Sequence, residues 1–253
     1  RNLIKTAVRS FRGELGREKA KYLFVMERPP SKALLGCSLI IARQGTPASP
    51  HIYFERRGKL LQFGSAKHGP TEIGGLILKG RFRRHKEKLG KQLSWIRFLY
   101  MARHPGRFEN KILAEFLPPF QNGKNLFWEC VGKRFTGLAY GAADRLSVYT
   151  KQFVFDLFPR RIAIQCLPKR VRGLLGKVGP GAEGARRMLL AIGFRKTSRI
   201  EPFDGGPYYE ASRKNLTLIR KMKKASFQGG GTLRKGKRIF VLVERRGKVR
   251  GCI

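Results

Sequence analysis

Short apolar runs bounded by turn residues dominate the first half of the chain. Each run is rich in β-branched and large apolar side chains, the composition typical of strands, and Pro29-Pro30 separates the first two. The predicted strands are Tyr22–Met26, Leu35–Ile41, His51–Glu55, Glu72–Leu78 and Lys111–Leu117.

A long helix is predicted after the fourth of these runs. Leu89, Leu93, Ile96 and Tyr100 recur at steps of four and three residues, which places them on one helical face, and His104 with the following Pro-Gly ends the pattern. Further on, the pattern predicts mostly helix over residues 125–159 and a helix over 184–191. Short strands are expected near 162–164, 193–195 and 208–210. Alternating strands and helices predict an α/β fold with a mixed sheet.

Charge is the most unusual property of the composition. The 253 residues include 55 Lys and Arg against 16 Asp and Glu, a formal net charge of +39. Such a surplus attracts anions, whether nucleotides, CoA phosphates, RNA or acidic membranes. A solvated basic surface without a dedicated partner fits the same numbers.

The cysteines and the apolar runs exclude several classes of protein. The four cysteines are scattered without metal-site spacing, and we expect no metal. No apolar run approaches the roughly 18 residues of a membrane span, and no signal-peptide pattern opens the chain. We expect a cytoplasmic protein with no membrane partner.

The segment from Glu72 to Arg103 reads as a strand, a basic turn and a helix. Seven Lys or Arg lie between Lys79 and Lys91. A turn that feeds a helix N-terminus offers backbone N–H groups and a positive dipole end to a phosphate, so this segment is a candidate pyrophosphate site. An ordinary helix preceded by a basic turn is the alternative.

A second segment carries a recognisable motif. Phe203-Asp-Gly-Gly-Pro207, with Gly193-Phe-Arg195 before it and Glu210 after it, resembles a signature of arginine N-succinyltransferases. Other blocks are similar to that family in the same order, and together they cover nearly the whole chain: Tyr22–Glu27, Glu72–Leu78, Leu93–Ala102, Phe127-Trp128, Gly132–Phe135, Ala143-Asp144 and Leu175–Val178. Family members run longer, so the chain is expected to be shortened at both ends.

The resemblance implies a GNAT-like acyl-CoA N-acyltransferase fold. It also implies transfer of a succinyl group from succinyl-CoA to the α-amine of L-arginine. By position, Leu76 corresponds to a leucine that contacts succinyl-CoA in the family. The pyrophosphate turn of GNAT-like enzymes reads Arg/Gln-x-x-Gly-x-Gly/Ala. Here Gly90 fits the last position, Lys88 replaces the first glycine and Arg84 is the nearest leading cation, with Lys91 next to the turn.

Acids within the matching blocks are candidates for the substrate site. The guanidinium of arginine favours a carboxylate partner in bidentate geometry. Glu72, Asp204 and Glu210 are the residues that we expect to supply it. For Asp204 the alternative is that its carboxylate stabilises its own turn.

The catalytic proton donor is the main departure from the family. The family has a histidine in the stretch Gly-x-Val-His-Pro, whereas this chain reads Gly176-Lys-Val-Gly179-Pro180. Glycine cannot transfer a proton, so the catalytic residue is unassigned. Tyr208, Tyr209, Cys166 or a histidine brought near by folding are the remaining options.

The expected organisation is a body over residues 1–212 and a basic segment over 213–253. The body would hold an acyl-CoA lobe, about 1–118, and a second lobe, about 119–212. In the basic segment the apolar run Ile239–Val243 is expected to fold onto the body. Two alternatives to an active enzyme remain: an impaired GNAT-like protein that binds RNA or another polyanion through its basic faces, and a degraded copy without function.

Overall fold

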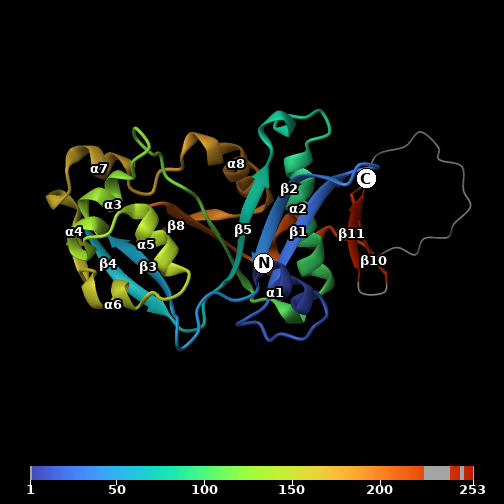
Figure 1. Cartoon of the computed structure of the whole chain (residues 1–253), viewed down its shortest axis with the longest axis horizontal. Helices are drawn as coiled ribbons and strands as arrows, with labels where there is room; N and C mark the ends of the chain where they lie inside the picture. The colour runs from blue at the N-terminus through green and yellow to red at the C-terminus, as the bar shows by residue number, and fades with distance from the viewer. Residues whose placement is uncertain (1, 225–239, 246–247, 253) are drawn as a thin grey trace, which may run out of the picture. The chain divides into compact units, whose positions relative to one another are not determined.

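The computed structural model describes residues 2–224, 240–245 and 248–252 (Figure 1). They form two compact units, and each unit is assembled from separate stretches of the chain. The first comprises Arg1–Ala42, Ile73–Asn110 and Ser212–Ile253, and the second comprises Arg43–Glu72 and Lys111–Ala211. The boundaries of these units differ from those of the lobes expected from the sequence, which were drawn by function, so the lobes stay a prediction.

In the first unit, α1 (Asn2–Phe11) lies against β1 (Lys21–Arg28), and β1 pairs antiparallel with β2 (Ala33–Ile41) from Lys21↔Ile41 onwards. The later part of β5 (Thr71–Leu78) and α2 (Leu89–Arg103) belong to the same unit. Its remaining described elements are short: η1 (Gly80–Phe82), η2 (Pro105–Arg107), η5 (Arg213–Asn215), α9 (Thr217–Arg220), β10 (Val241–Arg245) and β11 (Lys248–Cys252).

Aromatic side chains form the core of the first unit. Tyr100 of α2 is fully buried, and its ring packs at 5.1 to 5.6 Å from those of Phe11, Tyr22 and Phe24. The helical face predicted from the sequence is confirmed, because α2 begins and ends as expected and buries Leu93, Ile96 and Tyr100.

Part of the basic C-terminal segment packs on α2. The strands β10 and β11 pair antiparallel, and β10 contacts α2. Glu244 Oε2 lies 3.1 Å from His104 Nε2 and 3.7 Å from Arg103 Nε. Ile239, the first residue of the expected apolar strand, lies outside the described residues.

The second unit contains a sheet in the order β5-β6-β9-β8-β3-β4-β7. The start of β5 pairs parallel with β6, through Thr71↔Ile112 and Glu72↔Leu113, whereas the β3/β4, β3/β8, β4/β7 and β8/β9 pairs are antiparallel. The strands other than β5 are β3 (His51–Arg57), β4 (Leu60–Ala66), β6 (Lys111–Glu115), β7 (Arg161–Ala163), β8 (Arg195–Ile200) and β9 (Pro207–Ser212).

Short helices complete this second unit, and Figure 1 shows several of them around β3 and β4. Trp128 is fully buried in the core, where its ring stacks on that of Phe203 at 5.2 Å. The helices are α3 (Leu126–Cys130), α4 (Gly132–Thr136), α5 (Tyr140–Ser147), α6 (Gln152–Leu157), η3 (Ile164–Cys166), α7 (Lys169–Leu174), η4 (Pro180–Ala182) and α8 (Glu183–Ile192).

Among the described residues of the whole chain, no helix has the length and apolar character that a bilayer crossing requires.

Candidate functional site

The strand β5 is bent at Gly75, next to Leu76. Gly75 has φ +55°, a left-handed conformation that glycine adopts without strain, and a Cβ there would lie 3.2 Å from Leu39 Cβ. The side chain of Leu76 is half-buried. The bend therefore interrupts the regular strand at the residue that the sequence analysis assigned to succinyl-CoA.

A buried arginine ties β5 to α2. Arg97 donates from Nη1 to the carbonyl oxygen of Gly74 at 3.2 Å and from Nη2 to Ser94 Oγ at 2.8 Å. Its side chain is 2% exposed, and burial lowers the pKa of its guanidinium to about 9. The group is still a cation at neutral pH, and its hydrogen bonds fix the strand next to the bend.

The N-terminus of α2 follows a turn with two left-handed residues. Arg84 has φ +61° and Lys88, the N-cap of α2, has φ +52° and ψ +46°. The side chain of Lys88 makes no capping hydrogen bond, so it leaves the first N–H groups of the helix without a side-chain acceptor from the N-cap. Lysine thus takes a backbone conformation usually reserved for glycine, at the position where the GNAT-like pattern has glycine.

The predicted phosphate residues lie together in this turn. Arg84 is exposed, Gly90 is in the first turn of α2, and Lys91 Nζ lies 4.3 Å above the Trp95 ring. The other cations of the segment are exposed as well: Lys79, Arg81, Arg83, Lys86 and Lys88. The turn therefore offers a concentrated positive charge and a helix N-terminus to an anion.

In the second unit, Asp204 stabilises its own turn. Its Oδ1 accepts a 2.7 Å hydrogen bond from the N–H of Gly206. Glu201 Oε2 accepts from the N–H groups of Phe203 and Asp204 at 2.6 and 2.9 Å. Asn125 donates to the carbonyl oxygen of Asp204 at 3.0 Å and caps α3 through its own Oδ1. The local role that the sequence analysis considered for Asp204 is confirmed.

Four carboxyl groups influence one another around this turn. They are Glu72 at the start of β5, Glu115 at the end of β6, Glu201 and Asp204. Burial, followed by the charge of Asp204, raises the pKa of Glu201 to about 8. Burial also raises the pKa of Asp204 to about 7. Glu72 accepts a hydrogen bond from Gln44 Nε2.

Glu115 has a raised pKa although its side chain is exposed. Desolvation is the largest cause, and the negative charges of Glu72 and Glu201 follow. The neighbouring carboxylates disfavour a further negative charge on Glu115. Lys151 opposes the shift by favouring the carboxylate. Together the four groups form an acidic site, in which the pKa values of Glu115, Glu201 and Asp204 are raised, and the arrival of a cation stabilises their ionised forms.

Tyr208 and His51 adjoin these acids. Tyr208 Oη donates to the carbonyl oxygen of Ile52 at 3.1 Å and also has a hydrogen-bond contact with Glu115. The His51 ring stacks on that of Tyr208 at 5.6 Å and 24°. Burial, with the charges of Lys151 and Arg199, lowers the pKa of His51 to about 3, so its ring is neutral. Folding thus brings one of the four histidines next to the family motif.

Glu210, the third predicted substrate acid, lies in a different setting. Its Oε2 is 3.4 Å from Lys111 Nζ and its Oε1 is 3.9 Å from Arg199 Nη1. The structure therefore groups Glu72 with Asp204, and it places Glu210 in an ion-pair network of its own.

Gly179 has no room for a side chain. A Cβ at this position would lie 2.8 Å from the carbonyl oxygen of Pro118 and 3.1 Å from that of Leu117. The N–H of Gly179 donates to the Leu117 oxygen at 2.8 Å, which holds the two segments together. The backbone of residues 117–118 closes over the position where the family has its histidine.

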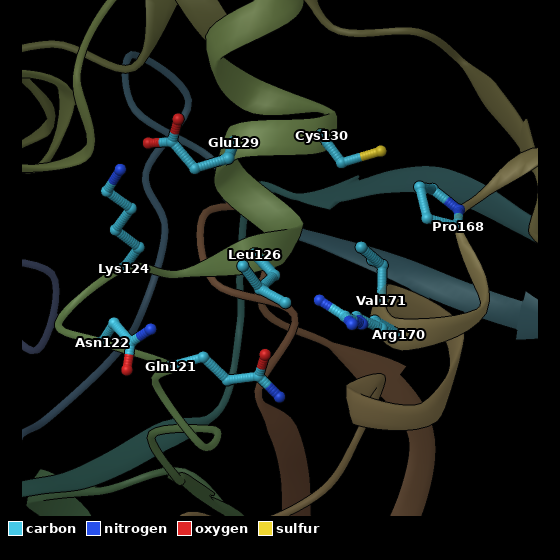
Figure 2. A pocket seen from close by; sticks show the side chains of 9 residues that line it. All are labelled: Gln121, Asn122, Lys124, Leu126, Glu129, Cys130, Pro168, Arg170 and Val171. Atoms are coloured by element: carbon cyan, nitrogen blue, oxygen red, sulfur yellow. The ribbon is translucent and has the colours of Figure 1, made fainter.

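A pocket of about 520 Å³ lies elsewhere in the second unit (Figure 2). Leu126, Val171 and Pro168 give it an apolar wall, and Lys124 and Arg170 supply positive charge. Its other lining residues are Gln121, Asn122, Glu129 and Cys130. None of the residues predicted from the sequence as site residues lines it.

Two residues of the acid group were not singled out from the sequence. Glu115 directly follows the buried run Ile112–Ala114, and Glu201 directly follows β8. An acid at the end of a buried strand is a signal that could have marked Glu115, whereas β8 is mostly exposed and gives no such signal for Glu201. Within residues 2–224, 240–245 and 248–252, no group of three or more His, Cys, Asp or Glu side chains is arranged so that it could hold a metal ion.

Comparison with known proteins identifies close similarity over most of the chain. The model of the arginine N-succinyltransferase beta subunit family matches residues 1–218. An arginine N-succinyltransferase subunit beta from Pseudomonas aeruginosa is 32% identical over 233 residues, covering 85% of this chain and 67% of that protein. An arginine N-succinyltransferase from Citrobacter koseri is 30% identical, covering 87% and 68%.

A solved structure agrees with these sequences. Subunit AI of the arginine/ornithine succinyltransferase from Pseudomonas aeruginosa superposes with a TM-score of 0.75 at 26% identity, covering 87% of this chain and 68% of that one. The expected GNAT-like fold with a mixed α/β sheet is confirmed. These similarities give no support to the alternative of an RNA-binding protein.

Proposed function

Because the chain belongs to the arginine N-succinyltransferase beta subunit family, we propose that it transfers a succinyl group from succinyl-CoA to the α-amine of L-arginine. The acid group of the second unit is the observation that carries the substrate assignment. Glu72, Glu115, Glu201 and Asp204 are four of the 16 acids in a chain of net charge +39.

This group suits a small organic cation. The surface as a whole repels arginine, so a binding site needs local negative charge to overcome that repulsion. Carboxylates bind a guanidinium through short, charge-assisted hydrogen bonds. A bound cation also favours the ionised form of acids whose pKa is raised. In this proposal Glu72 and Asp204 are the substrate-binding residues expected from the blocks that match the family, and Glu210 positions Arg199 and Lys111.

The acyl donor is assigned to the first unit. Arg84 and Lys91, with the N–H of Gly90 at the start of α2, would bind the phosphates of succinyl-CoA. Leu76 would contribute its backbone N–H and apolar contact, since its side chain has no acid–base chemistry. The bend at Gly75 supports this role because the positive φ of Gly75 departs from regular strand geometry directly before Leu76.

The reaction requires three events at the reacting atoms. The ammonium of arginine loses a proton, the amine nitrogen attacks the thioester carbon, and the C–S bond breaks to release the thiolate of CoA. An N–H donor must stabilise the oxyanion, and the thiolate must gain a proton. The scattered cysteines, which lack disulfide or metal spacing, support a cytoplasmic setting for this chemistry.

Release of free thiol tests the proposal. Purified protein is mixed with succinyl-CoA and L-arginine, with acetyl-CoA and ornithine as comparison substrates. Thiol release that depends on both substrates, with mass-spectrometric detection of succinyl-arginine, is expected. Absence of both products at high substrate concentration would contradict the activity.

Variants locate the donor site in the same assay. Arg84→Ala and Lys91→Ala are expected to raise KM for succinyl-CoA about tenfold each with little change in kcat, because a contact kept throughout the reaction contributes equally to ground and transition states. Lys5→Ala, an exposed cation on α1, is the matched control. Equal effects of all three variants would show that the turn is not the phosphate site.

A further inference from the structure

The proton-transfer group of this chain must lie away from Gly179. That position carries no side chain, and the carbonyl oxygens of Leu117 and Pro118 occupy the space around its Cα. A replacement needs a titratable group that water and substrate can reach, held in a fixed position by buried neighbours.

Tyr208 offers one hydrogen to two acceptors. Its hydroxyl donates to the Ile52 carbonyl oxygen at 3.1 Å, and the carboxyl of Glu115 is its second hydrogen-bond partner. An O–H group can donate only once. If Glu115 is protonated, it donates to Tyr208 Oη and Tyr208 donates to Ile52. If Glu115 is ionised, Tyr208 can turn its hydrogen to the carboxylate.

Rigid packing holds Tyr208 in place for this exchange. Its side chain is 1% exposed, and the neutral ring of His51 stacks on it. The Oγ1 of Thr197 donates to the carbonyl oxygen of Tyr208 at 3.2 Å. The hydroxyl therefore changes its partner by rotation of its hydrogen, without movement of the ring.

Glu115 differs from the other three acids in its contacts. Glu201 and Asp204 accept hydrogen bonds from backbone N–H groups, and Glu72 accepts one from Gln44. Glu115 is exposed, so a substrate ammonium can approach it. The charges that act on this pair from the surrounding elements are those of Glu72, Glu201, Asp204 and Lys151. Lys151 and Arg199 act on the His51 ring that stacks on Tyr208.

We propose that Glu115 is the general base of succinyl transfer, with Tyr208 as the positioning residue that stabilises its carboxylate. This inference rests on the proposed function. Glu115 takes one proton from the substrate ammonium, and the free amine forms the C–N bond while the carbonyl electron pair moves to oxygen. Collapse of the intermediate breaks the C–S bond. Protonated Glu115 gives its proton to the thiolate, and the second proton of the nitrogen leaves to solvent.

Two substitutions separate this role from substrate binding. Glu115→Gln is expected to lower kcat about 10²–10⁴-fold, the usual worth of general acid–base catalysis, with KM for arginine little changed. Tyr208→Phe removes the donor to the carboxylate, so the acidic limb of the pH–rate profile moves to higher pH. Glu129→Gln, a surface acid paired with Lys133, is the control and is expected to keep the wild-type profile.

The opposite pattern overturns the inference. A Glu115→Gln variant that raises KM at unchanged kcat would show a binding role alone, and an unmoved acidic limb in Tyr208→Phe would separate the two residues. If Glu115→Gln fails to fold, Glu115→Asp, which keeps the carboxyl but shortens the side chain, is expected to lose kcat with a retained pH limb.

A measurement without turnover distinguishes failure of the inference from failure of the proposed function. Carbon-13 NMR titration of the glutamate carboxyls follows Glu115 directly. Its pKa is expected above the ordinary range in the wild type and higher again in Tyr208→Phe, because the carboxylate loses a hydrogen-bond donor. An ordinary and unchanged pKa in both proteins would overturn the proton-transfer pair, whether or not the protein releases thiol.

Discussion

The N–H of Gly206 donates a 2.7 Å hydrogen bond to Oδ1 of Asp204, a carboxylate that is 7% exposed. Asp204→Ala removes this acceptor and leaves a buried donor unsatisfied, which is expected to cost about 1–3 kcal/mol of stability. Asp204→Asn keeps an acceptor oxygen and is expected to lose less. Urea unfolding of both variants measures the difference. Equal losses would show that charge, rather than the hydrogen bond, matters here.

The raised pKa of Glu201 predicts how stability depends on pH. The folded protein keeps a proton on Glu201 up to about pH 8, whereas the unfolded chain releases it near the ordinary value of 4.5. The stabilising effect of that proton is therefore complete below pH 4.5 and is lost as pH rises through about 8. Urea unfolding at several pH values is expected to show a shallower decline in Glu201→Gln than in the wild type.

Asp204 contributes to this decline in the same direction, because its pKa is also raised. A residual slope in Glu201→Gln is thus expected. Parallel curves for the two proteins would contradict the assignment of the proton to Glu201.

Arginine binding is expected to release protons. Its cation stabilises the ionised form of acids that are protonated in the free protein, so affinity should rise between pH 6 and 8 by up to about tenfold per pH unit for each proton released. Calorimetry in two buffers with different ionisation enthalpies gives the proton count. Citrulline, which lacks the guanidinium charge, is the control ligand and should show a smaller linkage. Equal linkage for both ligands would place the guanidinium away from these acids.

The bend in β5 depends on Gly75. Gly75→Ala forces a side chain into a left-handed conformation, at a cost of about 1–2 kcal/mol, and its Cβ would press on Leu39. Gly80→Ala is the control, since a Cβ there meets nothing within 4 Å. Thermal melting compares the two. A Gly75→Ala protein as stable as Gly80→Ala would mean that the bend relaxes without strain.

Restoring the family histidine is expected to fail. Gly179→His places its Cβ 2.8 Å from a backbone oxygen, so the segment at Pro118 must shift, and overpacking of this kind costs about 1–3 kcal/mol. Turnover is expected to stay at or below the wild-type level. Gly181→Ala, with open space around it, is the control for stability. A gain in kcat with an unchanged melting temperature would disprove this steric argument.

The main strands and the long helix were predictable because local apolar spacing determines them. The predicted helix at 89–103 coincides with α2, and the runs at 22–26, 35–41 and 72–78 lie within β1, β2 and β5. The strand β4 was missed, although Gly58 lies between two apolar runs in the manner of a hairpin turn. Its mixed composition, with Gln62, Gly64 and Ser65, conceals it.

The acid group shows what sequence alone could not supply. The blocks that match the family singled out Asp204 and Glu72, but the convergence of Glu115 and Glu201 with them depends on how β5, β6 and the turn after β8 are brought together. That is a property of long-range strand order. The same limitation applied to His51, whose ring meets Tyr208 from a strand 157 positions earlier by number (208 − 51).

The cations before α2 have a further consequence for an anion-free protein. Lys79, Arg81, Arg83, Arg84 and Lys86, with Lys88 and Lys91, repel one another and also the positive end of the helix dipole. Folding has to assemble this unfavourable arrangement before any phosphate neutralises it. The acyl donor would then act as a counterion that completes the structure, and the protein would be least robust in dilute buffers whose anions are small and singly charged.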